Sequence, residues 1–547
     1  MIEVSEIRVS LDQGATEEGC LDAARAAVCG LLGVKSRAIA HLELRRRSVD
    51  ARRKSDVHLM LTARVRLRDA ASEQAALSRV GSRDERRVRA VDERLQTWPQ
   101  ASAAPAGLGR PLVVGAGCAG LFAALALAEA GLEPLLVERG DDAGRRTQAV
   151  RAFNATGELD PESNIQFGAG GAGTFSDGKL TTGTKGAAHR LILQTFVEAG
   201  APREILWDAK PHIGSDLLPD VVERIVERIE ELGGEVRFRT RLVDIELDGG
   251  GAVSGAKVVR GGAEEHLAAR RIVLACGYSA RDVFALLDAR GVELARKTFA
   301  MGVRIEHLQV DIDRAQYGPA AGHPALGAAP YKLVAHCENG RSLFTFCMCP
   351  GGAVVAAASE PGGVVTNGAS LHARAGRNAN AALLVNVLPA DLPGEDPLEG
   401  VRLQRALEEA AFERGGGAFQ APVQLLGDFL EGRPSTRTGR VEPTYPRGVV
   451  PASFDGVLPL SIAATMRLGI PQLGAKLNGF DDPEAVLTGV ETRSSSPVTV
   501  VRGPDMQALG TPGLFPCGEG AGYAGGIMSA AADGIRAAEG VIASLKG

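Results

Sequence analysis

The stretch Pro111-Leu112-Val113-Val114-Gly115-Ala116-Gly117-Cys118-Ala119-Gly120 decides the fold. Its apolar residues predict a buried strand, and residues 121–130, rich in Ala and Leu, predict a helix directly after the glycines. In such a turn the first glycine permits the tight bend, the second lets the backbone approach a pyrophosphate, and the third allows close packing of helix on strand. A second strand, 135–137, ends at Glu138, where an acid can bind a ribose. The stretch therefore predicts a Rossmann-like dinucleotide-binding domain.

A second glycine-rich element near the C-terminus distinguishes FAD from NAD. Residues 514–516 are typical of a strand that enters the turn Gly518-Glu519-Gly520, and Gly525-Gly526 precede a helix of small residues. In flavoproteins with two dinucleotide-binding folds, an acid at this place binds the ribityl chain and the next helix start faces the flavin. The two elements together predict FAD. No second complete glycine fingerprint follows a later strand, which argues against a separate NADPH domain.

Size and composition limit the class of protein. The 547 residues are 45% hydrophobic and carry a net charge of -5, so the chain can form roughly two to four domains and has no global basic field for nucleic acid or anionic lipid. Its eight cysteines are scattered, and Cys347 and Cys349 are interpreted as buried structural thiols. The N-terminus lacks the pattern of a secretion signal. We expect a soluble cytoplasmic protein with no nucleic-acid, membrane or metal partner.

The pattern of elements divides the chain into five segments. We expect an N-terminal α+β domain at 1–100 and a linker at 101–110. The first part of the FAD-binding domain should cover 111–284, an inserted substrate domain 285–485, and the second part of the FAD-binding domain 486–547. In the N-terminal domain we expect strands at 2–11, 38–46 and 57–67, and one helix at 15–32.

Within the first FAD-binding part, an apolar stripe predicts a helix over 218–232, with Pro219 in its first turn, capped by Ser215 or Asp216 and ended by Gly233-Gly234. Three elements are expected after it: an alternating strand, a glycine hairpin and a buried strand, at 236–247, 249–251 and 271–277.

Between the two glycine-rich elements, the block Asn164-Ile165-Gln166-Phe167-Gly168-Ala169-Gly170-Gly171-Ala172-Gly173-Thr174-Phe175-Ser176-Asp177-Gly178-Lys179-Leu180 resembles a hallmark of a widespread, mostly uncharacterised family of FAD-dependent dehydrogenases. Further segments are similar to the family, at 50–54, 210–214, 302–307, 346–352, 489–493 and 518–526. The resemblance implies an α/β fold: a Rossmann-like FAD-binding domain of glutathione-reductase-like flavoproteins, with an inserted α+β substrate domain and a small N-terminal α+β domain. It supplies no substrate. The chain departs from the family at four positions: it has Tyr278 where the family usually has His, Ala169 in place of Glu, Ala369 in place of Met, and Ser494 in place of Thr.

The resemblance implies that the loop 170–179 passes beside the isoalloxazine ring. Glycines there let backbone N–H groups reach the ring, and Ser176 and Lys179 can stabilise negative charge on reduced flavin; Lys179 can alternatively be a solvent-facing loop lysine. The expected cofactor-binding residues are Gly115, Gly117, Cys118, Ala119, Gly120, Glu138, Arg139, Gly171, Gly173, Thr174, Ser176, Lys179, Val243, Gly277, Gly518, Glu519, Gly525, Gly526 and Ile527.

Five side chains are weak candidates for catalysis: His212, Tyr278, Arg304, Glu306 and His307. On a strand, Glu306 and His307 would point to opposite faces. Arg304 could clamp a carboxylate or pair with Glu306. For each histidine, a structural hydrogen-bonded role is favoured over catalysis.

The leading hypothesis is an FAD-dependent dehydrogenase or reductase that transfers hydride between FAD and a small molecule, with NAD(P)H as a candidate electron donor. One alternative is a flavin-dependent monooxygenase that uses NAD(P)H and O2, although residues 277–281 lack the Asp-Gly motif of aromatic hydroxylases. Another alternative is a tRNA-modifying flavoprotein or one that uses FAD structurally; the acidic net charge disfavours tRNA binding.

Overall fold

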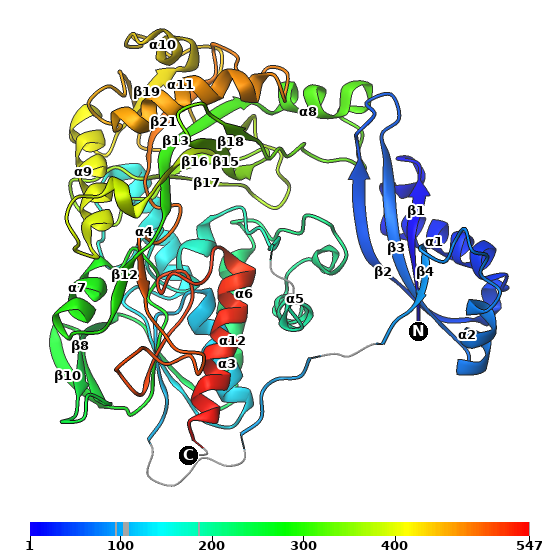
Figure 1. Ribbon diagram of the computed structural model, residues 1–547, viewed down its shortest axis with the longest axis horizontal. Helices are drawn as coiled ribbons and strands as arrows, with labels where there is room; N and C mark the ends of the chain where they lie inside the picture. The colour runs from blue at the N-terminus through cyan, green and yellow to red at the C-terminus, as the bar shows by residue number, and fades with distance from the viewer. Residues whose placement is uncertain (93–95, 102–108, 184–185, 546–547) are drawn as a thin grey trace.

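The computed structural model describes residues 1–92, 96–101, 109–183 and 186–545. Two lobes stand one above the other, and a separate N-terminal module lies at their side (Figure 1). The linker expected at 101–110 falls mostly outside the described residues.

The lower lobe is built on a five-stranded parallel sheet with the order β7-β6-β5-β11-β23. Its strands are Leu112–Val114 (β5), Leu135–Val137 (β6), Glu235–Arg237 (β7), Ile272–Leu274 (β11) and Leu514–Pro516 (β23). All except the edge strand β7 are fully buried, as strands covered on both faces must be. The predicted mixed α/β arrangement with a Rossmann-like sheet is thus confirmed, and strands far apart in the sequence share it.

Helices cover one face of this sheet: α3 (Cys118–Glu129), α5 (Ala188–Glu198), α6 (Leu218–Glu231) and α12 (Ile527–Ala543). The other face packs on α7 (Arg281–Ala289) and on a small antiparallel sheet of β8 (Thr240–Leu247), β9 (Val253–Arg260) and β10 (Ala263–Ala268). Next to α6, the 14-residue α4 (Ala143–Thr156) carries the buried Arg146.

Two expectations in this lobe are wrong. The single strand expected over 236–247 is two strands, because the chain turns at Arg239, whose φ is +52°, so β7 joins the parallel sheet and β8 the antiparallel one. Helix α6 has the expected Pro219 and apolar stripe, but neither Ser215 nor Asp216 caps it. Asp216 instead accepts a 2.7 Å hydrogen bond from the His372 N–H, and the Ser215 hydroxyl donates to the Ser370 carbonyl oxygen at 3.2 Å.

The upper lobe contains a seven-stranded sheet in which all neighbours are antiparallel except β19 and β20. In spatial order its strands are β14 (Val334–His336), β15 (Ser342–Cys349), β18 (Asn378–Val387), β13 (Phe299–Leu308), β21 (Val486–Glu491), β19 (Ala421–Leu425) and β20 (Val449–Pro451). Strand β21 lies beyond the boundary expected at 485, so the sheet extends past it. Helices α8 (Gln309–Tyr317), α9 (Glu399–Arg414), α10 (Leu426–Glu431) and α11 (Leu460–Gly474) surround the sheet.

The chain enters and leaves the upper lobe through two strands that pair with each other, β12 (Leu294–Arg296) and β22 (Val498–Val500). A further short pair, β16 (Ala353–Ala356) and β17 (Thr366–Ala369), lies beneath the large sheet. Among the described residues, none of the helices has both the length and the apolar run that a bilayer crossing requires.

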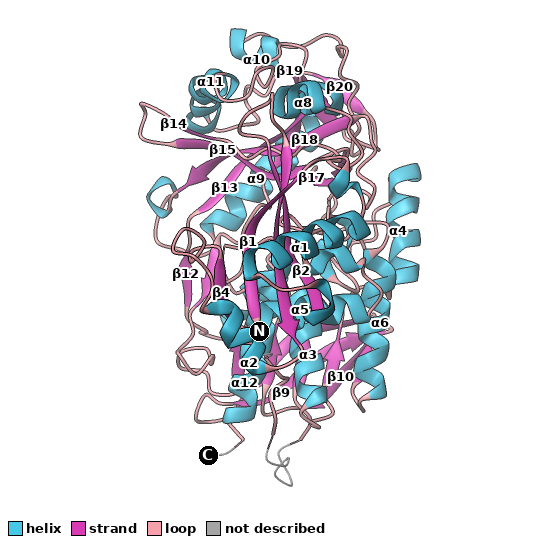
Figure 2. Ribbon diagram, turned by 90° about the vertical axis from the view of Figure 1, so that its right-hand side faces the viewer, coloured by secondary structure: helices cyan, strands magenta, loops and turns pink. Residues whose placement is uncertain are grey.

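The N-terminal module is an antiparallel sheet, β2-β3-β1-β4, with helices on its outer side (Figures 1 and 2). Its elements are β1 (Ile2–Val9), α1 (Glu17–Leu32), β2 (Ile39–Asp50), β3 (His58–Leu67), α2 (Ala70–Leu77) and β4 (Val88–Ala90). The expected helix and strands are present. One of the contacts that join the module to the lobes is made by Arg47, whose N–H donates to the Trp207 carbonyl oxygen (2.7 Å) and whose carbonyl oxygen accepts from the Ala209 N–H (2.9 Å). The Arg47 side chain donates to the Ala325 carbonyl oxygen at 2.7 Å.

Helices α3 and α12 pack backbone to backbone at Gly534, where an added Cβ would overlap the Ala119 carbonyl oxygen. We expect Gly534→Ala to lower the apparent melting temperature, since such overpacking costs about 1–3 kcal/mol. Gly30→Ala in α1 is the matched control, because its Cβ would meet no atom of the described residues within 4 Å, and Ala is favoured over Gly in a helix by about 0.5–1 kcal/mol. Equal melting of the two variants in a thermal scan would contradict this packing.

Candidate active site

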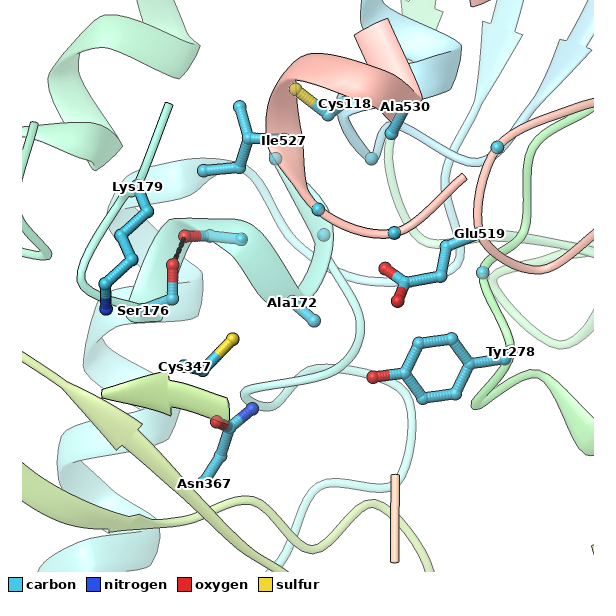
Figure 3. A pocket seen from close by; sticks show the side chains of 18 of the residues that line it. Cys118, Ala172, Ser176, Lys179, Tyr278, Cys347, Asn367, Glu519, Ile527 and Ala530 are labelled. Atoms are coloured by element: carbon cyan, nitrogen blue, oxygen red, sulfur yellow. Dashed lines mark hydrogen bonds between the residues drawn. The ribbon is translucent and has the colours of Figure 1, made fainter. Parts of the chain in front are cut away.

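A cavity of about 800 Å³ lies between the carboxyl ends of the parallel strands and the seven-stranded sheet. Residues directly after β5, β6, β11 and β23 line it, as expected where ligands bind open α/β sheets. Side chains from the upper lobe close the opposite wall, among them Cys347 and Asn367 (Figure 3). The volume is in the range of small-molecule and cofactor sites, about 300–1,000 Å³.

One end of the cavity contains the start of α3. Gly115 has a φ of +98°, and a Cβ there would lie 2.6 Å from the Ala275 carbonyl oxygen. The N-cap of α3 is Gly117, and no side chain of the described residues caps the helix, so its first N–H groups are available to an anion. Gly115, Gly117, Cys118 and Ala119 line the cavity, whereas Gly120 lies behind the turn, where a Cβ would overlap the Gly115 carbonyl oxygen.

The start of α12 faces the same cavity. Its N-cap, Gly526, has a φ of +99° and, within the described part of the chain, no side-chain cap. Gly518, Glu519, Gly525, Gly526 and Ile527 all line the cavity, and Gly277 lines it between the two helix starts. The Gly518 N–H is fixed by a 2.8 Å hydrogen bond to buried Asp533, which pairs with Arg502. Two uncapped helix N-termini thus present unpaired N–H groups to a ligand in one cavity.

Glu138, directly after β6, is buried and binds three backbone N–H groups. Its carboxylate accepts hydrogen bonds from the N–H groups of Ala116 (2.7 Å), Gly140 (2.9 Å) and Gly168 (2.9 Å). Glu138 therefore ties the glycine fingerprint to the segment that leads into the loop 170–179. It lines the cavity together with its neighbour Arg139.

The loop 170–179 is tied to the glycine fingerprint, since the Gly170 N–H donates to the Ala116 carbonyl oxygen at 2.7 Å. Gly171, Gly173, Ser176 and Lys179 line the cavity, and the Ser176 hydroxyl donates to the Gly173 carbonyl oxygen at 2.7 Å (Figure 3). The Lys179 ammonium is 3.1 Å from the Asp177 carboxylate and only 30% exposed, so it is not a freely solvated loop lysine.

Two other expected cofactor residues do not line the cavity. Thr174 is buried, and its hydroxyl donates to the Ala169 carbonyl oxygen at 3.1 Å. Val243 lies beside a bulge in β8, and its neighbours Arg241 and Leu242 line the cavity in its place.

Of the catalytic candidates only Tyr278 lines the cavity; its side chain lies next to Glu519 and its hydroxyl donates to the Arg493 carbonyl oxygen (Figure 3). His212 stacks on His372, with its Nε2 2.9 Å from the His372 carbonyl oxygen. His212 therefore makes a hydrogen bond to backbone outside the cavity, and its structural role stays a prediction.

The other three candidates lie on β13 and are buried outside the cavity. Glu306 and His307 point to opposite faces, as expected: the Glu306 carboxylate accepts from Thr444 (2.6 Å), and the His307 ring is 2.8 Å from the Phe480 carbonyl oxygen. Arg304 pairs with Glu491 at 3.0 Å, not with Glu306.

The expectation that Cys347 is a buried structural thiol is wrong. Both cysteines line the cavity, but only Cys349 is buried as expected; Cys347 is exposed to the cavity, and its backbone has a φ of +39°, which is unusual for a residue with a Cβ. The residue types in this segment give no signal for such a local backbone conformation. All eight cysteines, each within the described residues, are free.

Burial controls the protonation of the groups around the cavity. It raises the pKa of the Glu519 carboxyl to about 7, although the Gly526 N–H and Lys297 act in the opposite direction. Burial also raises the pKa of the Cys347 thiol to about 12, and that of the Tyr278 hydroxyl well above its ordinary value. Near neutral pH, Tyr278 and Cys347 therefore hold their protons.

The chain is similar to known proteins over nearly its whole length. A protein from Clostridium beijerinckii, described as uncharacterized, is 42% identical over 544 residues, 99% of this chain and 98% of that protein. Residues 109–309 match the family "pyridine nucleotide-disulphide oxidoreductase", and residues 298–494 match "FAD-dependent protein, C-terminal domain-like". Residues 1–66 match a domain of unknown function, DUF8436.

Solved structures give weaker likenesses. A variant of a flavin-dependent brominase is 14% identical with a TM-score of 0.37, over 80% of each chain. A complex of aklavinone-11 hydroxylase with FAD and aklavinone is 16% identical with a TM-score of 0.33, over 80% of this chain and 63% of that one. At these TM-scores, neither indicates an activity for this chain.

The family matches, the two helix starts and the cavity between them agree on the cofactor, which is FAD. The chain belongs, with the Clostridium beijerinckii protein, to a family of FAD-binding oxidoreductases.

Proposed function

We propose that the protein is a dehydrogenase or reductase that passes hydride between FAD and a small molecule, with NAD(P)H as a candidate donor. The observation that carries the proposal is one continuous cavity that begins at two uncapped helix N-termini and extends to the wall formed by the upper lobe. When bound, FAD supplies the hydride acceptor or donor at its N5 atom. The remaining part of the cavity is available to a substrate.

The residues that would hold FAD follow from the geometry. The start of α3 would bind the pyrophosphate, and Glu138 the adenosine ribose. Glu519 and the start of α12 would hold the ribityl chain and the flavin edge. We further propose that the lower lobe is of the glutathione-reductase-like class, which the central position of β5 and the match of residues 109–309 support. Residues 285–485 would then supply the substrate domain.

Cys347 and Lys179 would act on the bound molecule and the cofactor. Tyr278 uses its proton in the hydrogen bond to the Arg493 carbonyl oxygen, whereas the Cys347 thiol faces the cavity with its proton in place and would donate a hydrogen bond to a bound molecule. Lys179 would stabilise negative charge on the reduced cofactor.

The reaction class is tested with the purified FAD-loaded protein. We expect NADH or NADPH to bleach the visible flavin band without oxygen, and reoxidation in a stopped-flow instrument to proceed without a peroxyflavin spectrum. A peroxyflavin spectrum would instead establish the monooxygenase alternative. A colourless protein that cannot be reconstituted with FAD would contradict the whole proposal.

Lys179→Met should lower the midpoint potential of the flavin, because it removes a positive charge that favours the reduced state. Lys179→Arg keeps the charge and is the matched control. The potentials are measured by spectroelectrochemical titration, and equal potentials for both variants and the parent would contradict the role of Lys179.

Glu519 should make the stability of the FAD-free protein depend on pH. Its carboxyl keeps a proton up to about pH 7 in the folded state, but loses it near the ordinary pKa of 4.5 in the unfolded chain. The folded state therefore binds an extra proton between these values, and the stability that this proton provides is complete below pH 4.5 and lost as the pH rises through 7.

We accordingly expect the melting temperature of FAD-free Glu519→Gln to fall less than that of the parent between about pH 5 and about pH 8. Parallel curves for the two proteins in a fluorescence-monitored thermal scan would show that Glu519 has no raised pKa.

A further inference from the structure

We propose that the substrate is an organic carboxylate with an apolar body, held at the outer part of the cavity by Lys210 and Lys332. This inference rests on the proposed function, since it places the substrate in the same cavity as FAD. It adds the chemical class of the substrate and two residues that recognise it.

Different segments bring the two lysines to the cavity that Lys179 lines. Lys210 precedes Pro211, whose carbonyl oxygen accepts a 2.9 Å hydrogen bond from the Leu180 N–H, so its segment runs beside the end of the loop 170–179. Lys332 is in a segment held against β15, where the Leu333 N–H donates to the Thr345 hydroxyl at 2.8 Å. Both lysines line the cavity.

The charges at this part of the cavity do not cancel. Lys179 and Arg374 share the Asp177 carboxylate, and all three residues line the cavity. Among the described residues, neither Lys210 nor Lys332 makes an ion pair, so the lining here contains four cations and the one carboxylate of Asp177, with Asp208 near Lys210 but outside the lining. The other nearby acid in the lining, Glu491, is neutralised by buried Arg304. A local positive excess in a chain of net charge -5 favours an anionic ligand.

Lys210 in particular lacks compensation. Its side chain is exposed at the cavity, and partial desolvation of the ammonium group and the nearby Arg374 lower its pKa, while Asp208 acts in the opposite direction. An anion bound beside Lys210 would offset the repulsion from Arg374.

Apolar side chains form part of the wall of the same cavity, which favours an organic acid over an inorganic anion. Tyr331 and Met348 line the cavity and are buried, and Phe346 lines it while 39% exposed. Aromatic and thioether groups gain by covering an apolar ligand surface. A carboxylate at the lysines would leave the body of its molecule against these side chains.

The test uses the FAD-loaded protein and benzoate, which combines a carboxylate with a flat apolar body. Benzoate is titrated while the visible flavin spectrum is followed, with benzamide as the neutral probe of the same shape and inorganic phosphate as the anion without an apolar body. We expect saturable perturbation by benzoate at a concentration at least about tenfold lower than either comparison probe requires.

In the double variant Lys210→Gln/Lys332→Gln, we expect benzoate binding to weaken by about a hundredfold, or about tenfold for each charged contact. Lys35→Gln, an exposed lysine of the N-terminal module that does not line the cavity, is the matched control and should bind as the parent does.

The outcomes separate the two proposals. Equal binding of benzamide and benzoate by the parent protein, or benzoate binding that the double variant does not weaken, would overturn the carboxylate assignment while FAD content and bleaching by NAD(P)H leave the proposed function intact. If phosphate or NADPH, and not benzoate, depends on the lysines, the assignment is also wrong and the lysines serve the phosphates of the electron donor.

Discussion

The site depends on backbone brought against backbone at the start of α3. Three glycines lie where a Cβ would meet a main-chain carbonyl group. The carbonyl group is that of Ala275 for Gly115, that of Gly115 for Gly120, and that of Ala119 for Gly534. Because these contacts leave no room for side chains, α3 begins directly after β5, and α12 can lie against it. The unpaired N–H groups of both helix starts are thereby directed to one cavity, where those of α3 can attract the anionic pyrophosphate of a dinucleotide.

Carboxylates and arginines then fix the segments around this contact. Glu138 connects the glycine fingerprint to Gly168, and Asp533 holds the turn at Gly518. On the side of the upper lobe, buried Glu408 binds both Arg281, at the start of α7, and Arg493, just after β21. Each of these bonds joins segments distant in the sequence, so the cavity is assembled by long-range polar contacts on a framework of local strand-turn-helix units.

This division explains which features the sequence could predict. The fingerprint, Glu138, the loop 170–179 and the 518–527 element are local patterns with a known physical purpose, and almost all of their residues line the cavity. The partner of Arg304 could not be found in the same way, because Glu491 is on another strand and is adjacent only after the sheet forms. The exposure of Cys347 could not be predicted, because it depends on the positive φ of this residue and on the cavity that distant segments form around it. The break at Arg239 likewise depends on a positive φ.

The two main-chain hydrogen bonds between Arg47 and residues 207–209 have a consequence for truncated forms of the protein. A fragment that begins after the N-terminal module would leave the Trp207 carbonyl and the Ala209 N–H without these partners, next to Lys210 at the cavity. Exposed main-chain groups of this kind are a template for pairing with another chain. The N-terminal module thus covers the main-chain groups of residues 207–209, and its loss would favour self-association of the two lobes through these groups, next to the cavity.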